Sequence, residues 1–352
     1  MVYEVIPMNR PKQSALFRRL RMTFFCVPLA AIFLLPQLFS GFLLPRQVET
    51  AVIHTAAGDV TRQEFETSNS AFTQHIRTWT DAENTVVRSD RFAPVSGTQT
   101  HESTVLTVKG TGTMRTYDVK ANRWSEAPLC AGTFPKGMYF IRADGGDSII
   151  VTPLAYRDRG TGMIEYLPSS DGTLEITKTA DGFSLSVQSG SVPVGAFSDA
   201  LVLTSHRQLF DWNDGDTLTH WQNYRFTDDN RWCWSGYYYT APPEYYPNGE
   251  NYFHALPGAY ITCKMVRNAE DGACRMLGIA MLDVMRRQQN EQGFLPSTAG
   301  STWLKKDYGI EPGYYDTRFN TDLWLAVVNA AENYGVTEWL PQAREYADFL
   351  VQ

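Results

Sequence analysis

The pattern of hydrophobic and polar positions changes along this chain of 352 residues. Residues 23–44 contain no charged side chain, and a helix of that length would rise about 33 Å, enough to cross a bilayer core of about 30 Å. From 45 to 204, short β-branched runs alternate with turns that contain Gly and Asp, as in a β-sandwich. From 205 onward, apolar residues recur at three- and four-residue spacing, which predicts helices.

The runs that read as strands are residues 103–108, 137–142, 148–152, 173–177, 183–187 and 200–204. Residues 60–80 favour a helix, since Phe65, Phe72 and Ile76 roughly share one helical face. Further helices are predicted over 257–268, 272–291, 320–334 and from Thr337 onward. Asn320 or Thr321 would cap the helix over 320–334, and Gly335 would end it in the left-handed conformation.

Basic residues precede the apolar run of residues 23–44. Five of them outweigh Glu4 and give residues 1–22 a charge of +4: Arg10, Lys12, Arg18, Arg19 and Arg21. The positive-inside rule then places the N-terminus in the cytoplasm and the C-terminal part outside, as in a single-pass protein of the cell membrane. We favour an uncleaved transmembrane helix over a cleaved signal peptide, because the run is long and no small-residue cleavage site follows it.

The net charge limits the partners. The chain carries −7 in total, so residues 45–352 carry −11, which argues against nucleic acid as a partner. Cys130, Cys233, Cys263 and Cys274 are scattered without a C-x-x-C spacing, so a zinc site is not expected and their disulfide state stays open. The sequence contains no phosphate-binding loop, dinucleotide fingerprint or G-x-S-x-G motif. We therefore expect neither a cofactor nor a metal.

Aromatic residues concentrate between Trp221 and Tyr260, a stretch with three Trp, eight Tyr and two Phe. Aromatic rings offer an apolar face and, in Trp and Tyr, a polar handle, which suits the faces and edges of sugar rings. An aromatic core under a long loop is the alternative. The candidate substrate-binding residues of this stretch are Trp232, Trp234, Tyr238, Glu250 and His254.

The segment GYYDTRFNTD crowds polar side chains at the predicted start of a helix. Exposed N–H groups there favour carboxylates such as Asp316 and Asp322. Arg318 could hold a carboxylate of the protein or of a uronic acid through a bidentate contact. We assign Tyr315, Asp316, Arg318 and Asp322 as candidate catalytic residues and Asn320 as substrate-binding. Helix capping with a structural ion pair is the alternative.

This segment follows QQNEQGFLP, which closes an earlier predicted helix, and the two together resemble the repeating hairpins of α/α-toroid proteins. These proteins include six-hairpin glycosidases, polysaccharide lyases and the C-terminal domain of glucuronyl C5-epimerases. The resemblance covers roughly residues 205–352 and implies a sugar-binding cleft lined by helix N-termini. The predicted helices make about two hairpins, fewer than a closed toroid needs.

The predicted fold class is therefore multi-domain α+β: a basic segment (1–22), a transmembrane helix (23–44), a β-sandwich-like domain (45–204) and a toroid-like α/α-hairpin domain (205–352). We expect an extracytoplasmic protein that binds or processes a cell-envelope polysaccharide or exopolysaccharide. A hydrolase would need two carboxylates, while a lyase or epimerase would use Tyr or His with Arg. The alternative is a non-catalytic envelope assembly or scaffold protein that binds a protein partner.

Overall fold

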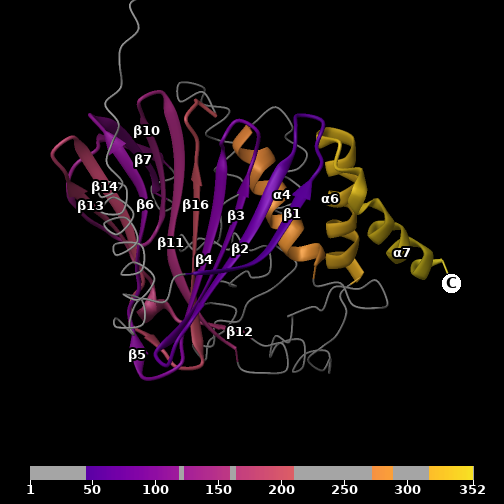
Figure 1. Cartoon of the computed structure of the whole chain (residues 1–352), viewed down its shortest axis with the longest axis horizontal. Coiled ribbons are helices and arrows are strands. Elements are labelled where there is room, and N and C mark those ends of the chain that lie inside the picture. The colour runs from indigo at the N-terminus through magenta and orange to yellow at the C-terminus, as the bar shows by residue number, and fades with distance from the viewer. Residues whose placement is uncertain (1–44, 119–122, 159–163, 210–271, 288–316, 352) are drawn as a thin grey trace, which may run out of the picture. The chain divides into compact units, whose positions relative to one another are not determined.

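The computed structural model describes residues 45–118, 123–158, 164–209, 272–287 and 317–351 (Figure 1). Most of these residues form antiparallel strands. The strands are β1 (Arg46–Ile53), β2 (Val60–Ser68), β3 (Phe72–Thr80), β4 (Val86–Pro94), β5 (Thr98–Gln99), β6 (Glu102–Lys109), β7 (Gly112–Asp118), β8 (Arg123–Pro128), β9 (Gly132–Phe134), β10 (Met138–Ala143), β11 (Gly146–Asp158), β12 (Ile164–Tyr166), β13 (Thr173–Lys178), β14 (Gly182–Gln188), β15 (Val192–Pro193) and β16 (Ala196–Thr204).

Ten of the strands form one large sheet. Its order is β1-β2-β3-β4-β16-β11-β10-β7-β8, and β12 pairs with β11. A four-stranded sheet has the order β6-β14-β13-β9, and β15 pairs with β5. The helices are α4 (Gly272–Arg286), α6 (Thr317–Tyr334) and α7 (Leu340–Leu350), with short 3-10 turns at Pro168–Ser170 and Thr337–Trp339.

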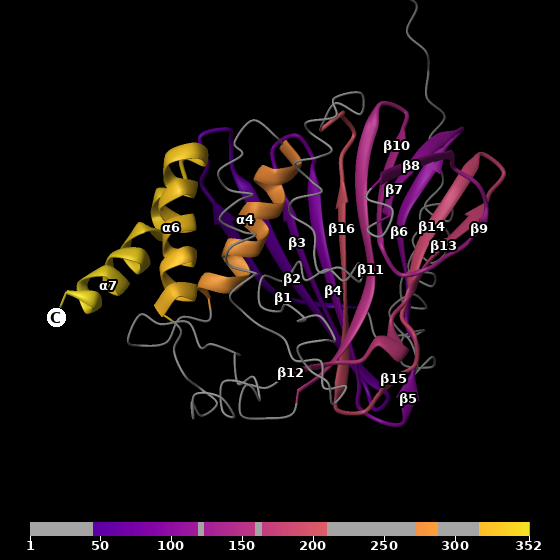
Figure 2. The ribbon, with the colours of Figure 1, turned by 180° about the vertical axis from the view of Figure 1, so that it is seen from behind.

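The large sheet is covered by different layers on its two faces. On one face, alternate residues such as Trp79, Val87 and Leu201 pack against the apolar sides of α4 and α6 (Figures 1 and 2). On the other face, Ile150 and Val202 pack against the four-stranded sheet. Because side chains of a strand alternate between faces, β16 contributes to both cores.

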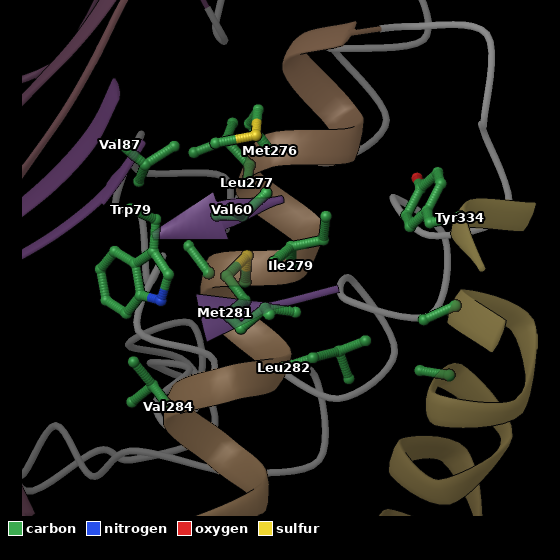
Figure 3. Close-up of a cluster of buried hydrophobic side chains, with 14 of the residues drawn as sticks. Val60, Trp79, Val87, Met276, Leu277, Ile279, Met281, Leu282, Val284 and Tyr334 are labelled. Atoms are coloured by element: carbon green, nitrogen blue, oxygen red, sulfur yellow. The ribbon is translucent and has the colours of Figure 1, made fainter. Parts of the chain in front are cut away.

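Helix α4 supplies the centre of the helix-side core. Met276, Ile279 and Leu282 are fully buried, and Figure 3 shows them between the sheet residues and Tyr334 of α6. The three- and four-residue spacing of these side chains is the helical pattern read from the sequence. The helices and the sheet therefore share one hydrophobic core.

The expected fold class is wrong for the described chain. Strands make up 53% of it and helices 20%, so it is mainly β and not an α+β assembly with an α/α toroid. Its three α-helices are short, and among the described residues no helix has the length and apolarity needed to cross a bilayer. The expected span over residues 23–44 and the helix over 257–268 lie outside the described residues.

The helix predicted within residues 60–80 is also wrong, because this stretch forms β2 and β3. Buried positions of β2 include Arg62 and Glu64, and these charges break the alternation of apolar and polar residues that identifies a strand. The six strand-like runs, by contrast, all fall within or overlap strands β6, β10, β11, β13, β14 and β16.

The C-terminal helices differ in one detail from the prediction. Helix α6 begins at Thr317, so Asn320 and Thr321 lie inside the helix and do not cap it. Gly335 does end the helix in the left-handed region, with φ of 74°. Its amide donates to the carbonyl of Ala331, as expected for a glycine after a helix.

Candidate functional site

The site predicted from the sequence cannot be located among the described side chains. Two of its catalytic candidates and all five aromatic-segment residues lie outside the described residues: Tyr315, Asp316, Trp232, Trp234, Tyr238, Glu250 and His254. Arg318, Asn320 and Asp322 lie in α6, where the backbone alone is described. The proposed cluster therefore stays a prediction, and the polar groups that the structure does bring together lie elsewhere.

Asp283, one of the fully buried carboxylates, is presented by α4 to the large sheet. Its side chain is 0% exposed, and it accepts hydrogen bonds from Arg62 Nη1 at 2.9 and 3.0 Å and from Trp79 Nε1 at 2.9 Å. Arg286, one turn later, donates to it at 2.7 Å. Four donated bonds satisfy a carboxylate that would otherwise be costly to bury.

Glu64 forms a second centre beside Asp283. It is buried and lies 3.1 Å from His75 Nε2, 3.4 Å from Arg77 Nε and 3.3 Å from Arg62 Nε. Arg287, directly after α4, also bonds to it. Burial alone would raise the pKa of Glu64. The hydrogen bonds from His75 and Arg287, with the charge of Arg77, outweigh burial and hold that pKa far below its ordinary value of 4.5.

Glu49 of β1 completes this group of charges. It bonds to Arg62 and lies 2.8 Å from Arg287 Nη2. Burial lowers the pKa of Arg62, but the carboxylates, Asp283 foremost, raise it above its ordinary value. We call the group the helix-side network; it consists of Glu49, Arg62, Glu64, His75, Arg77, Asp283, Arg286 and Arg287. Its charges are paired with one another, so it fastens α4 to the sheet.

A second polar cluster lies on the opposite face of the same sheet. Asp90 of β4 accepts from Gln74 Nε2 at 2.8 Å and from Arg88 Nη2 at 3.0 Å, with His101 Nε2 at 3.8 Å. Burial raises the pKa of Asp90, and the contacts with His101 and Gln74 bring it below its ordinary value. Arg88 also donates to Ser103 of β6 at 2.8 Å, so this cluster joins the two sheets.

One face of β2 and β3 is covered by no helix or sheet of the described part of the chain. Thr61 lies opposite Thr80, Gln63 opposite Thr78, and Phe65 opposite Ile76, and residues directly opposite in an antiparallel pair share a face. All six side chains are half-buried, whereas Arg62 and Trp79 on the other face are buried. We call these six residues, Thr61, Gln63, Phe65, Ile76, Thr78 and Thr80, the uncovered face.

The uncovered face is hollowed where β2 begins and β3 ends. A shallow depression of about 630 Å³ is lined by Thr61, Gln63 and Thr80, and by Gly58, Asp59, Asp81 and Ala82 of the neighbouring turns. Hydroxyl and amide groups there can donate and accept hydrogen bonds, and carboxylate groups can accept them. Phe65 and Ile76 supply apolar surface next to them. The arrangement suits a polar ligand that also has apolar C–H surface.

Sequence reasoning missed this surface because residues 60–80 were assigned to a helix. Side chains of a strand alternate between its two faces, so Thr61, Gln63, Thr78 and Thr80 fall on one side of a hairpin. The pattern was not recognised because the alternate positions Arg62 and Glu64 are charged and not apolar. As for metals, the part of the chain that the structure describes contains no group of three or more His, Cys, Asp or Glu side chains that could hold one.

Comparisons with known proteins do not identify the chain. No family model matches it, and no curated protein does. Among solved structures it is similar to the Slr1438 protein from Synechocystis sp. PCC 6803, with 11% identity and a TM-score of 0.25. The match covers 45% of this chain and 65% of the other, and at this TM-score it carries no inference about fold or function. None of these findings shows a toroid or glycosidase family.

Proposed function

We propose that this protein binds a glycan without processing it at the described sites, and that the sugar contacts the uncovered face of β2 and β3. The observation that carries the proposal is the row of Thr61, Gln63, Thr78 and Thr80 beside Phe65 on one open sheet surface. Sugar hydroxyls exchange hydrogen bonds with such hydroxyl and amide groups. The apolar face of a sugar ring packs on an aromatic ring.

The state of the buried carboxylates supports binding over catalysis. A glycoside hydrolase needs one carboxyl group that is protonated near neutral pH. Glu64 and Asp90 instead have lowered pKa values because cationic or hydrogen-bonding groups surround them. We place the binding domain outside the cytoplasm, a proposal supported by the basic residues that precede the apolar segment 23–44.

The proposal is tested by titrating the full-length chain with a panel of neutral and uronic-acid polysaccharides. Binding is followed by protein NMR, and the sugars are followed in D₂O for new reducing ends, unsaturation or deuterium exchange. We expect binding without chemical change of the sugar. Gln63→Ala combined with Thr78→Ala should weaken binding about tenfold, as expected for the loss of two hydrogen bonds at roughly 0.5–1.5 kcal/mol each.

Ser125→Ala provides the matched control, because this exposed hydroxyl lies on β8 at the opposite edge of the sheet. It should leave the affinity unchanged. If no polysaccharide binds, or if the Gln63/Thr78 double variant binds as tightly as the wild type, the proposal is wrong. Cleavage or isotope exchange of a sugar would instead show that the protein is an enzyme.

A scaffold that binds a protein partner is the second candidate, and one observation favours it. Four aromatic side chains of the C-terminal helices and the 3-10 turn between them are buried in the core: Trp324, Tyr334, Trp339 and Tyr346. Aromatic residues that are held inside serve packing, as in a scaffold, whereas a sugar platform exposes them. Co-purification of a defined envelope protein that Gln63→Ala does not disturb would favour this function.

A further inference from the structure

The two facing sheets enclose a cavity that the glycan proposal does not use. Its volume is about 520 Å³, within the range of about 300–1,000 Å³ that is usual for small-molecule sites. It lies between β6 of the four-stranded sheet and β10, β11 and β16 of the large sheet. The site is thus separate from the uncovered face, which belongs to β2 and β3.

One wall of the cavity is a row across three strands of the large sheet. Ser148 of β11 lies opposite Ile141 of β10 on one side and opposite Thr204 of β16 on the other. All three line the cavity. Ile141 belongs to the apolar core between the sheets, so this wall runs from an apolar interior to two hydroxyl groups.

The other wall is formed by β6, which contains an irregularity at this point. Leu185 of β14 pairs with Leu106, but Ser186 pairs with Thr104, so Val105 is an additional residue. A bulge of this kind changes the direction of the side chains beside it. Val105 and Leu106 are consecutive, yet both line the cavity and both pack against the core between the sheets.

The mouth of the cavity is polar and carries a cation that pairs with no described residue. Lys109 at the end of β6, Asp144 in the β10–β11 turn and His206 after β16 all line it and are all exposed. None of the described residues forms an ion pair with Lys109. An anionic group that enters the mouth would meet this ammonium, with the carboxylate of Asp144 and the imidazole of His206 beside it.

From these walls and this mouth we infer that the cavity binds a fatty acid, with its acyl chain between Val105, Leu106 and Ile141 and its carboxylate beside Lys109. Val105, Leu106, Val108, Ile141 and Ala143 provide the apolar lining that an acyl chain requires. From Lys109 to Val105 the strand extends about 13 Å at roughly 3.3 Å per residue. That length accommodates a medium-length chain.

The test uses a dodecanoate analogue with a diazirine at the end of its chain. The full-length protein is irradiated at increasing concentrations of this probe, and the modified peptides are identified by mass spectrometry. We expect saturable labelling of the peptides that contain residues 105–109 or 138–143. Absence of saturable labelling, or labelling confined to other peptides, would overturn the inference.

Two variants separate the roles of the chain and the head group. Val105→Trp fills the cavity and should weaken labelling at least tenfold, with circular dichroism showing that the fold is retained. Lys109→Glu, an exposed change that leaves the cavity walls intact, should weaken labelling by dodecanoate several-fold. It should not weaken labelling by the corresponding diazirine alcohol.

Lys178→Glu is the matched control, because Lys178 is an exposed lysine of β13 that does not line the cavity. The dodecanoate probe should label this variant to the same extent as the wild type. If Lys178→Glu weakens labelling as much as Lys109→Glu, or if folded Val105→Trp labels normally, the site is not the one proposed. A sugar that binds the uncovered face should leave labelling unchanged, so the two proposals can fail separately.

Discussion

At the scale of single residues, Asp283 shows how a charge comes to be placed in an apolar helix face. The residues around it on α4, such as Met276 and Leu282, are core residues. Asp283 occupies the same face because Arg62 and Trp79 of the sheet donate to it. A hydrophobic pattern identifies the helix, but it cannot identify the partner of a buried charge that lies 221 residues away in the sequence.

Removing this carboxylate is expected to destabilise the fold strongly. Asp283→Ala leaves Arg62 buried without its main counter-charge, and breaking one side of a buried ion pair costs about 3–5 kcal/mol. Urea unfolding of the variant and the wild type measures the difference. Asp348→Ala is the control, because its ion pair with Arg344 is largely exposed, and it should change stability little. Equal effects of the two variants would contradict a structural role for the network.

Glu64 gives a prediction about pH. Its folded-state pKa lies below the ordinary value of 4.5, chiefly because the contacts with His75 and Arg287 outweigh burial. Ionised Glu64 therefore stabilises the fold fully above about pH 4.5, and this contribution is lost as pH falls toward the lowered pKa. Glu64→Gln should be less stable than the wild type by about 2 kcal/mol at pH 7.

The difference between Glu64→Gln and the wild type should then shrink as the pH is lowered from 5 to 3, as measured by urea midpoints. Glu126→Gln, on the exposed surface of β8, serves as the comparison. A difference between Glu64→Gln and the wild type that stays constant over this range would show that Glu64 has the same pKa in both states.

At the scale of elements, local patterns predict the helices and many of the strands. The runs within β13 and β14 alternate cleanly and are separated by Asp181-Gly182, and the structure confirms this hairpin. Strands β2 and β3 were missed for a physical reason. Their inward positions carry charges that pair with one another and with Glu49 of β1 and Asp283 of α4. A strand whose buried face is ionic has no hydrophobic period.

The end of α6 gives a prediction at this scale. Gly335 has a positive φ, and a Cβ on it would lie 2.9 Å from the backbone nitrogen of Ala56. Gly335→Ala should therefore destabilise the fold in two ways. The alanine would be strained in the left-handed conformation, at about 1–3 kcal/mol, and its Cβ would clash with Ala56. Thermal or urea unfolding measures the loss.

Gly195→Ala is the matched control for Gly335→Ala. Gly195 has a similar φ of 78° but open space where its Cβ would stand. It should lose less stability than Gly335→Ala. If both substitutions cost the same, the contact between the end of α6 and the β1–β2 turn contributes nothing.

At the scale of the whole described unit, the central strands of the large sheet are more deeply buried than its edge strand β1. Strand β16 is covered by the helices on one face and by the four-stranded sheet on the other, while β1 at the sheet edge exposes Val48 and Val52. Native-state hydrogen exchange should therefore be slowest in β16 and β11 and fastest in β1. Comparable protection in β1 and β16 would contradict this layer arrangement.

The arrangement of layers could not be predicted from the sequence. It depends on which strands are neighbours, and β16 pairs with β4 and β11, far from it in the chain. Likewise, the predicted cluster around Asp316 and Arg318 came from a short local motif, whereas the uncovered face needs the register of β2 against β3. A short motif contains no information about the register of strands. The fold class inferred from the resemblance to α/α toroids was therefore wrong.

The Ala56 amide donates a hydrogen bond to the Tyr334 carbonyl at 2.7 Å, so the β1–β2 turn can complete its native contacts only after α6 has been synthesised. Synthesis delivers β1 and β2 long before α4 and α6. Until α4 and α6 have emerged, Arg62 and Trp79 lack the carboxylate that they bind, and one face of the first strands has no cover. The nascent chain must therefore wait for its final third before its first hairpin reaches the native state. Until then, the side of the hairpin that α4 covers in the native state is exposed, and surfaces of this kind are the ones on which partly folded chains aggregate.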